Sequence, residues 1–135
     1  MNPDFRLSRR RHLRLGRAGE NAASRLLREK RYEILVRDWR CPFGEIDLVA
    51  RDGLTLVFVE VKTRRAGGAG RPAEALRRRQ RERIVNASRH YLRRIDRPAV
   101  PVRYDLVEVV ISSWGLVELR HWPDHFQAGS RRYEH

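Results

Sequence analysis

Cysteine is nearly absent from this sequence, since Cys41 is the only one among 135 residues. A single cysteine excludes a disulfide framework and a cluster of thiolate metal ligands, and it suits a reducing compartment such as the cytoplasm. Apolar runs are also short, and none approaches the roughly 18 residues that predict a membrane span. Ser8-Arg9-Arg10 superficially resembles the start of an export signal, but Arg14 and Arg17 follow where such a signal needs an apolar segment. We therefore expect a cytoplasmic protein with no membrane attachment.

Lysine is the second scarce residue type. Lys30 and Lys62 are the only lysines, so arginine supplies the rest of the 30 basic residues. The arginine bias is typical of a GC-rich genome, but it makes Lys62 informative, because lysine offers a compact ammonium group that arginine does not. With only 17 acidic residues, the chain has a formal net charge of +13 and a pI near 11.4. This charge indicates a polyanionic partner, and nucleic acid is the first candidate.

The centre of the chain has the pattern of a β-hairpin. Two runs rich in Val, Leu, Ile and Phe, residues 44–51 and 54–64, flank the pair Asp52-Gly53. Asp-Gly between two apolar runs is the strongest short-range signal of a hairpin. If these two residues form the turn, Asp47 lies opposite Phe58, and alternate side chains share a face. A four-residue loop would keep the same faces, whereas a three-residue loop would reverse them.

Four charged side chains then project from one face of the hairpin, namely Glu45, Asp47, Glu60 and Lys62. The register places Glu45 opposite Glu60 and makes Asp47 a diagonal neighbour of Glu60, on the order of 5–8 Å away. Such close carboxylates repel each other unless a cation lies between them. Mg²⁺ binds one or two carboxylates and keeps waters that a phosphate can replace, and Lys62 could hold such a water or phosphate oxygen. The alternative is a solvated face with a cross-strand Glu–Lys pair, but three apolar residues on the same face indicate that it is partly covered: Val49, Leu56 and Phe58.

These charged residues also carry a resemblance. Asp47, a hairpin and then Glu60-x-Lys62 resemble the PD-(D/E)xK active site of restriction-endonuclease-like nucleases. Two longer strings together resemble the YraN family of small uncharacterised bacterial proteins, described as similar in fold to archaeal Holliday-junction resolvases: Gly44-Glu45-Ile46-Asp47-Leu48-Val49-Ala50 and Phe58-Val59-Glu60-Val61-Lys62-Thr63-Arg64. The resemblance implies a divalent-metal-dependent endonuclease that hydrolyses DNA, with branched DNA among its expected substrates. Asp47 and Glu60 would hold Mg²⁺ or Mn²⁺, the Val61 backbone carbonyl would be a further ligand, and Lys62 would orient the attacking water.

Glu20 is a further candidate for the catalytic site. Between about residue 13 and residue 30, small and apolar residues recur at three- and four-residue steps, which predicts a helix. Glu20 lies at the edge of the apolar stripe, so it can either face the proposed metal site or pair at the surface with Arg17 or Arg28. The segment Gly16-x-x-Gly19-Glu20-x-x-Ala23 resembles the opening of the YraN family, which favours a role at the site.

A second helix is predicted from Pro72 to about Ile95, because apolar residues recur along one stripe and proline suits a first helical turn. Five arginines lie within seven positions of its first half beside a single acid, Glu82, and they repel one another unless an anion is present. We expect them to contact phosphate, the alternative being a solvated helix face. Gln80 is the polar exception in the apolar stripe and is expected to point toward the site. The predicted nucleic-acid-binding residues are Arg64, Arg77, Arg78, Arg79, Gln80, Arg81 and Arg83; here Arg79-Gln80-Arg81 resembles a Lys-Gln-Arg string of the family, with arginine in place of its lysine.

Other polar residues near the C-terminus have weaker patterns. Asp105 is expected to be a structural acid that pairs with Arg103. His121 and His125 could bind zinc as a pair, but neither a cysteine nor a third histidine lies nearby in the sequence to complete the site.

The order of elements predicts a single α/β domain of the restriction-endonuclease-like class. Its mixed central β-sheet is flanked by helices in the order α-β-β-β-α-β-β, with the strands outside the hairpin at 32–40, 102–111 and 116–122. The domain is expected to span residues 13–126, with a disordered basic arm at 1–12, a flexible loop at 65–72 and a disordered tail at 127–135.

Two alternatives to a nuclease are a nucleic-acid-binding protein of the same fold without nuclease activity, and a basic protein associated with RNA or the ribosome. The nuclease is favoured over a protein that only binds, because such a protein gains nothing from carboxylates that face a polyanion. DNA is favoured over RNA as the partner. If the protein cuts both strands of a branched DNA symmetrically, it would act as a homodimer.

Overall fold

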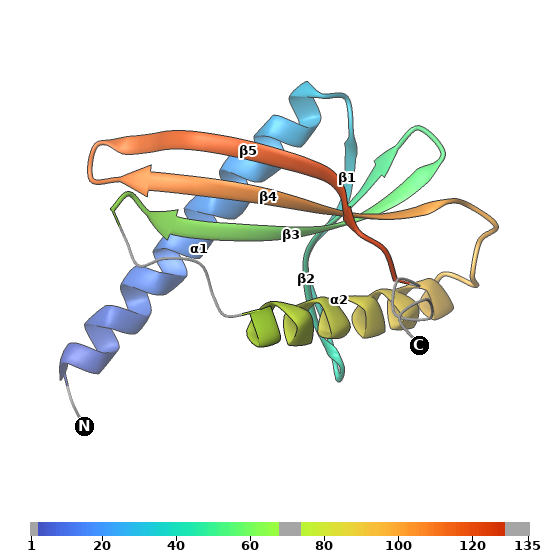
Figure 1. Ribbon diagram of the computed structural model, residues 1–135, viewed down its shortest axis with the longest axis horizontal. Coiled ribbons are helices and arrows are strands. Elements are labelled where there is room, and N and C mark those ends of the chain that lie inside the picture. Colours follow the sequence, from blue (N-terminus) through green and yellow to red (C-terminus); the bar gives the residue numbers. More distant parts are fainter. Residues whose placement is uncertain (1–2, 68–73, 129–135) are drawn as a thin grey trace.

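A five-stranded β-sheet lies between two helices (Figure 1). The structure, a computed structural model, describes residues 3–67 and 74–128. The predicted α/β class and the order α-β-β-β-α-β-β are confirmed. The elements are α1 (Pro3–Glu29), β1 (Glu33–Cys41), β2 (Gly44–Asp52), β3 (Thr55–Arg65), α2 (Glu74–Arg94), β4 (Val102–Ser112) and β5 (Gly115–Phe126).

The strands follow one another across the sheet in chain order, with β1 and β5 at its edges. Only the β3–β4 pair is parallel, and α2 supplies the crossover connection that a parallel pair requires. The three other pairs are antiparallel. No helix among the described residues is long and apolar enough to cross a membrane.

Each helix covers one face of the sheet. Alternation along the strands divides the apolar residues into two clusters, one for each helix. The cluster beneath α1 contains Ala23, Leu27, Leu48, Ala50, Val57, Val59, Val107 and Val109. The cluster beneath α2 contains Ile46, Val49, Leu56, Phe58, Ile84, Ala87, Tyr91 and Tyr104. Val49, Leu56 and Phe58 are therefore buried by α2, as expected for a covered face.

The turn of the central hairpin differs from the prediction by one residue. Asp52 pairs with Thr55, so the two-residue loop is Gly53-Leu54 rather than Asp52-Gly53. Gly53 has φ 60°, a left-handed conformation that glycine adopts without strain, and this favours it at the first loop position. The shift preserves the faces of both strands, but it moves the register by two residues, so that Val49 and not Asp47 pairs with Phe58.

The strands β1 and β2 bend together beside Asp47. Asp38 has φ 51° and lies opposite Asp47, between the pairs Arg37–Leu48 and Trp39–Ile46. Beyond this point the side chains of β2 no longer alternate regularly between the two faces of the sheet. Ile46 and Val49 are three positions apart, yet both pack beneath α2. Asp47 therefore lies at a bend in the sheet, where the side chains of a strand change direction.

Several predicted boundaries are wrong. Helix α1 begins at Pro3, so residues 3–12 continue the helix where a disordered arm was expected; proline suits the first position of a helix. Strand β5 extends to Phe126, beyond the predicted end at residue 122, because it pairs with β4 as far as Tyr104. Most of the predicted loop, Pro72 at the predicted start of the second helix, and residues 129–135 of the predicted tail lie outside the described residues.

Candidate active site

Asp47 lies where the hydrogen-bonded pairing of β2 with β3 ends. Leu48 and Val59 form the last pair of that ladder. One position further, Asp47 Oδ2 accepts a hydrogen bond from the Val61 backbone N–H at 2.8 Å. The carboxylate thus replaces the strand carbonyl that would otherwise accept this bond, and it remains close to β3 where the strands separate.

Glu60 and Lys62 of β3 project from the same face, and α2 completes their surroundings. Lys62 Nζ lies 2.9 Å from Glu60 Oε1 and donates a hydrogen bond to Gln80 Oε1 at 2.8 Å. The Glu60 side chain is only 12% exposed, whereas that of Lys62 is 41% exposed. The predicted inward direction of Gln80 is confirmed, since its side chain accepts a hydrogen bond from the Lys62 ammonium group inside the cavity.

These side chains line one cavity of about 370 Å³ between the sheet and α2. Asp47, Glu60 and Lys62 contribute the charges on the sheet side, as the sequence predicted. Gln80 and Arg83 lie on the α2 side, so the cavity has both anionic and cationic walls. A cavity lined by both carboxylates and cationic groups can hold a cation next to a phosphate.

Burial raises the pKa of Asp47 to about 7. The hydrogen bond from Val61 N–H opposes this shift, whereas the neighbouring carboxylates Glu20, Glu60 and Glu45 raise the pKa further. The negative charge of Asp47 is therefore poorly compensated at neutral pH. A cation bound beside Asp47 would compensate its negative charge.

Glu20 reaches this region because α1 lies very close to β3. A Cβ added at Gly19 would meet Thr63 Oγ1 at 1.7 Å, so only glycine permits this approach. Burial raises the pKa of Glu20, and Asp38 adds to the effect. Glu20 also raises the pKa of Asp47, so the two carboxylates interact electrostatically, although Glu20 is not among the residues that line the cavity.

The predicted register placed Glu45 opposite Glu60, and this is wrong. Glu45 instead lies at the rim of the cavity. It pairs with Arg40 across the β1–β2 ladder, and the two side chains form an ion pair at 3.3 Å. Its side chain is 56% exposed. Glu45 is therefore a weaker candidate ligand than Asp47 or Glu60.

The arginines of α2 divide into two groups. Arg78, Arg79 and Arg83 are exposed, and Arg83 borders the cavity. Arg77 and Arg81 are half-buried, and the Arg81 guanidinium lies 5.7 Å from the centre of the Phe126 ring. Arg64 is exposed on β3, two positions beyond Lys62.

The donors at the site fit a hard divalent cation. Two carboxylates, a backbone carbonyl and water form a donor set that Mg²⁺ accepts. Asp47 and Glu60 supply the carboxylates, and Val61 lies between Glu60 and Lys62 on the same strand. Among the described residues, no three His, Cys, Asp or Glu side chains are grouped so that they could hold a metal ion.

His121 and His125 have separate surroundings. His121 is buried between Lys30 Nζ, 2.9 Å from Nδ1, and Asp105 Oδ2, 2.8 Å from Nε2. Asp105 also forms an ion pair with Arg103 at 2.9 Å, which confirms the predicted pairing of these two residues. Burial lowers the pKa of His125, as does Arg81, while Glu60 acts in the opposite direction. The sequence did not indicate this electrostatic interaction, because it joins β5 to β3 across the sheet.

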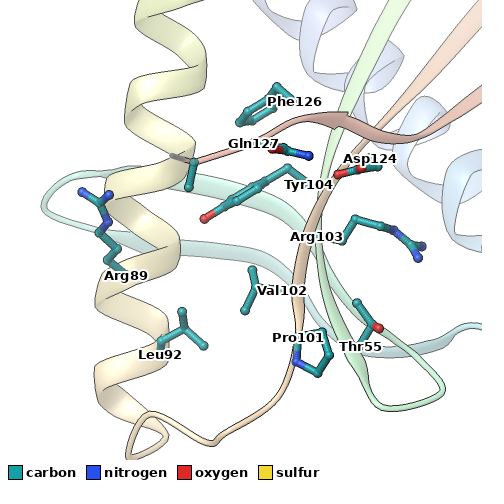
Figure 2. A pocket seen from close by; sticks show the side chains of 11 residues that line it. Thr55, Arg89, Leu92, Pro101, Val102, Arg103, Tyr104, Asp124, Phe126 and Gln127 are labelled. Carbon is teal, nitrogen blue, oxygen red and sulfur yellow. The ribbon is translucent and has the colours of Figure 1, made fainter. Parts of the chain in front are cut away.

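A second cavity of about 630 Å³ lies between α2 and the beginning of β4 (Figure 2). Tyr104 and Phe126 stack along it with ring centres 5.0 Å apart, and Arg89 and Leu92 of α2 also line it. None of the residues that line it lines the first cavity. The charged residues that were predicted from the central hairpin, Glu45, Asp47, Glu60 and Lys62, line the first cavity, whereas Glu20 lines neither.

The fold and the site define a mixed α/β protein with a compact Asp-Glu-Lys group beneath an arginine-rich helix. The chain belongs to the uncharacterised protein family UPF0102, also called the YraN family, whose model matches residues 19–109. The resemblance seen in the two hairpin strings is thus confirmed. The matched region contains Glu20, Asp47, Glu60, Lys62 and Gln80.

Similar proteins come from distant bacteria. A UPF0102 protein of Nocardia farcinica is 47% identical over 98 residues, which cover 73% of this chain and 77% of that protein. A UPF0102 protein of Beutenbergia cavernae is 44% identical over 107 residues, 79% of this chain and 91% of that protein. A UPF0102 protein of Geobacter sulfurreducens is 41% identical over 113 residues, 84% of this chain and 88% of that protein.

Proposed function

We propose that this protein is a divalent-metal-dependent nuclease that hydrolyses phosphodiester bonds in DNA. The observation that carries the proposal is the convergence of Asp47, Glu60 and Lys62 on one cavity. A buried carboxylate with an uncompensated charge, a second carboxylate and an ammonium group have the chemistry that phosphodiester hydrolysis needs.

Asp47, Glu60 and the Val61 carbonyl would hold Mg²⁺ or Mn²⁺. When bound, such a cation lowers the pKa of a water and neutralises charge on the phosphate. Lys62 would orient the attacking water or stabilise the negative charge that develops on the phosphate oxygens. Gln80 keeps the ammonium group in the cavity, and Glu20 adds negative charge behind Asp47, which favours cation binding.

The positive surface would bind the DNA backbone without regard to sequence. Arg83 borders the cavity, and Arg78 and Arg79 lie exposed on the same half of α2. Guanidinium groups bind phosphate oxygens with paired hydrogen bonds. The formal net charge of +13 supports the same partner.

One observation favours the alternative of a nucleic-acid-binding protein without nuclease activity. Lys62 forms an ion pair with Glu60 at 2.9 Å, so the ammonium already compensates one carboxylate. Asp47 argues against this alternative, because its pKa is near 7 and its negative charge is poorly compensated. A bound polyanion would not compensate that charge, whereas a bound cation would.

A cleavage assay separates the two functions. End-labelled branched DNA, linear DNA and RNA are incubated with Mg²⁺, Mn²⁺ or EDTA, and the products are resolved on denaturing gels. We expect metal-dependent cleavage of DNA by the wild type, and a loss of at least a hundredfold for Asp47→Asn and for Lys62→Ala.

Asp96→Asn is the matched control for Asp47→Asn, because Asp96 is exposed just beyond the end of α2. If none of the proteins cuts while all bind DNA, the nuclease proposal is wrong and the binding protein remains. Equal trace cleavage by every variant would indicate a contaminating nuclease.

A further inference from the structure

The turn between β4 and β5 presents a tryptophan to solvent. Trp114 is 97% exposed, the most exposed large apolar side chain among the described residues. Tryptophan normally buries a large apolar area, so complete exposure leaves a flat aromatic surface without a packing partner. Ser112 fixes the turn, because its Oγ accepts a hydrogen bond from Trp114 N–H at 3.1 Å and donates one to the Gly115 carbonyl at 3.2 Å.

Cationic side chains lie next to this turn. Arg64 and Arg65 are exposed at the end of β3, and they pair with Val110 and Ile111, just before the turn. The Ala66 N–H donates a hydrogen bond to the Ile111 carbonyl at 3.0 Å, which extends the contact of the two segments to the tip of the sheet. An exposed aromatic ring at a turn beside a strand that ends in two exposed arginines suits a ligand that carries both flat rings and phosphates.

The turn follows β4, and β4 pairs with β3, the strand that carries Glu60 and Lys62 of the candidate active site. Lys62 pairs with Glu108, and the turn begins four residues later, at Ser112. At about 3.3 Å per residue, this separation is roughly 13 Å along the sheet. One strand of a DNA duplex advances 3.4 Å per base pair, so the distance corresponds to about four base pairs.

We propose that Trp114 stacks on a base that is not covered by a neighbouring base pair, as at a single-stranded segment or a branch point of nucleic acid. Arg64 and Arg65 bind the adjacent phosphates. This assigns branched or partly single-stranded DNA as the substrate class. The assignment deepens the proposed nuclease function and rests on it for one consequence, namely that cleavage falls about four nucleotides from the unstacked base.

Leu54 provides a matched comparison within the same fold. It is 81% exposed in the β2–β3 turn, at the beginning of β3, whereas the Trp114 turn lies beside the end of β3. Leu54 has no flat ring to stack on a base. The effect of Leu54→Ala on binding therefore shows what the loss of an exposed apolar side chain does when no stacking is involved.

Binding is measured in EDTA by competition against a labelled single strand. The competitors are unlabelled single-stranded DNA, a four-way junction and relaxed circular duplex, which has no ends. For Trp114→Ala we expect about tenfold weaker binding of the single strand and the junction, the size expected for one stacked base, and less than a twofold change for the circle. Trp114→Phe should keep most of the affinity, and Leu54→Ala should behave as the wild type.

Three outcomes would overturn the inference. They are unchanged binding by Trp114→Ala, an equal loss for all three competitors, and a wild-type dimer in sedimentation that Trp114→Ala dissociates, since the turn would then bind a second copy. Circular dichroism of each variant checks that the fold is kept.

The test also separates this inference from the proposed function, because binding in EDTA does not depend on cleavage. If Asp47→Asn abolishes cleavage but Trp114→Ala binds as the wild type, the nuclease proposal is supported and the proposal that Trp114 stacks on a base is wrong. If the wild type cuts nothing but Trp114→Ala loses its preference for unstacked bases, the stacking surface stands and the nuclease falls.

Discussion

Asp47 shows how the requirements of the site and of the fold differ at a single residue. Its carboxyl group is held between two separating strands by one hydrogen bond from Val61. Burial and the carboxylates around it disfavour its charged form. A site that binds a cation must keep this charge, although its loss would make the protein without metal more stable.

This conflict predicts the pH dependence of stability. The pKa of Asp47 is raised from its ordinary 3.8 to about 7, so between these values the folded state holds a proton that the unfolded state has released. The contribution of this carboxyl to the free energy of unfolding therefore falls as the pH rises from about 4 to 7, and it stays low above 7. At pH 8 in EDTA, Asp47→Asn should be more stable than the wild type by on the order of 3 kcal/mol.

Urea unfolding followed by circular dichroism measures this difference. The advantage of Asp47→Asn should shrink at pH 5 and should be absent for the control Asp96→Asn. Excess Mg²⁺ should stabilise the wild type but not Asp47→Asn, because only the wild type keeps the charged ligand. A variant less stable than the wild type at pH 8 would contradict the electrostatic account.

At the scale of elements, the site depends on how closely α1 lies against β3. Gly19 permits this approach, since an added Cβ would lie 1.7 Å from Thr63 Oγ1. Gly19→Ala should destabilise the protein by roughly 1–3 kcal/mol and weaken metal binding, because the helix must move away together with Glu20.

Gly16 offers the matched control on the same helix. An added Cβ there has nothing within 4 Å, so Gly16→Ala should be neutral or stabilising by up to about 1 kcal/mol. Thr63→Ala in the Gly19→Ala background should restore part of the stability, because two of the three clashing atoms are removed. Calorimetric melting and Mn²⁺ titration test both points, and equal melting temperatures for the two alanine variants would refute the close contact.

Helix α2 contributes the second positioning contact. Gln80 accepts a hydrogen bond from Lys62 Nζ, and hydrogen bonds to charged groups contribute about 1.5–3 kcal/mol. Gln80→Ala should therefore lower kcat by at least about tenfold while DNA binding in EDTA stays within twofold. Gln80→Glu retains an acceptor and should recover most of kcat. A change in KM alone would mean that Gln80 binds DNA and does not position Lys62.

At the scale of the whole molecule, local patterns predicted the order of elements but not the contacts between distant segments. The common face of Asp47, Glu60 and Lys62 survived an error of one residue in the turn, because the two-residue loop preserves the parity of the strands. Gln80 was identified as a polar interruption of an apolar stripe. The Gly19–Thr63 contact and the electrostatic interaction of His125 with Glu60 had no local signal, since each joins elements that only the folded sheet brings together.

The exposed arginines of α2 predict how DNA binding depends on salt. Each phosphate neutralised releases counterions, so the logarithm of the affinity falls with the logarithm of salt concentration with a slope of about −0.9 per contact on duplex DNA. Arg78→Ala and Arg79→Ala should each make the slope shallower by about 0.9, because both side chains are exposed on the half of α2 beside the site. Arg93→Ala and Arg94→Ala, at the opposite end of α2, change the net charge equally and should leave the slope unchanged. Fluorescence anisotropy from 50 to about 200 mM salt measures all four slopes. Equal changes at both ends of the helix would mean that DNA responds to the total charge of the molecule and that no defined surface of α2 binds it.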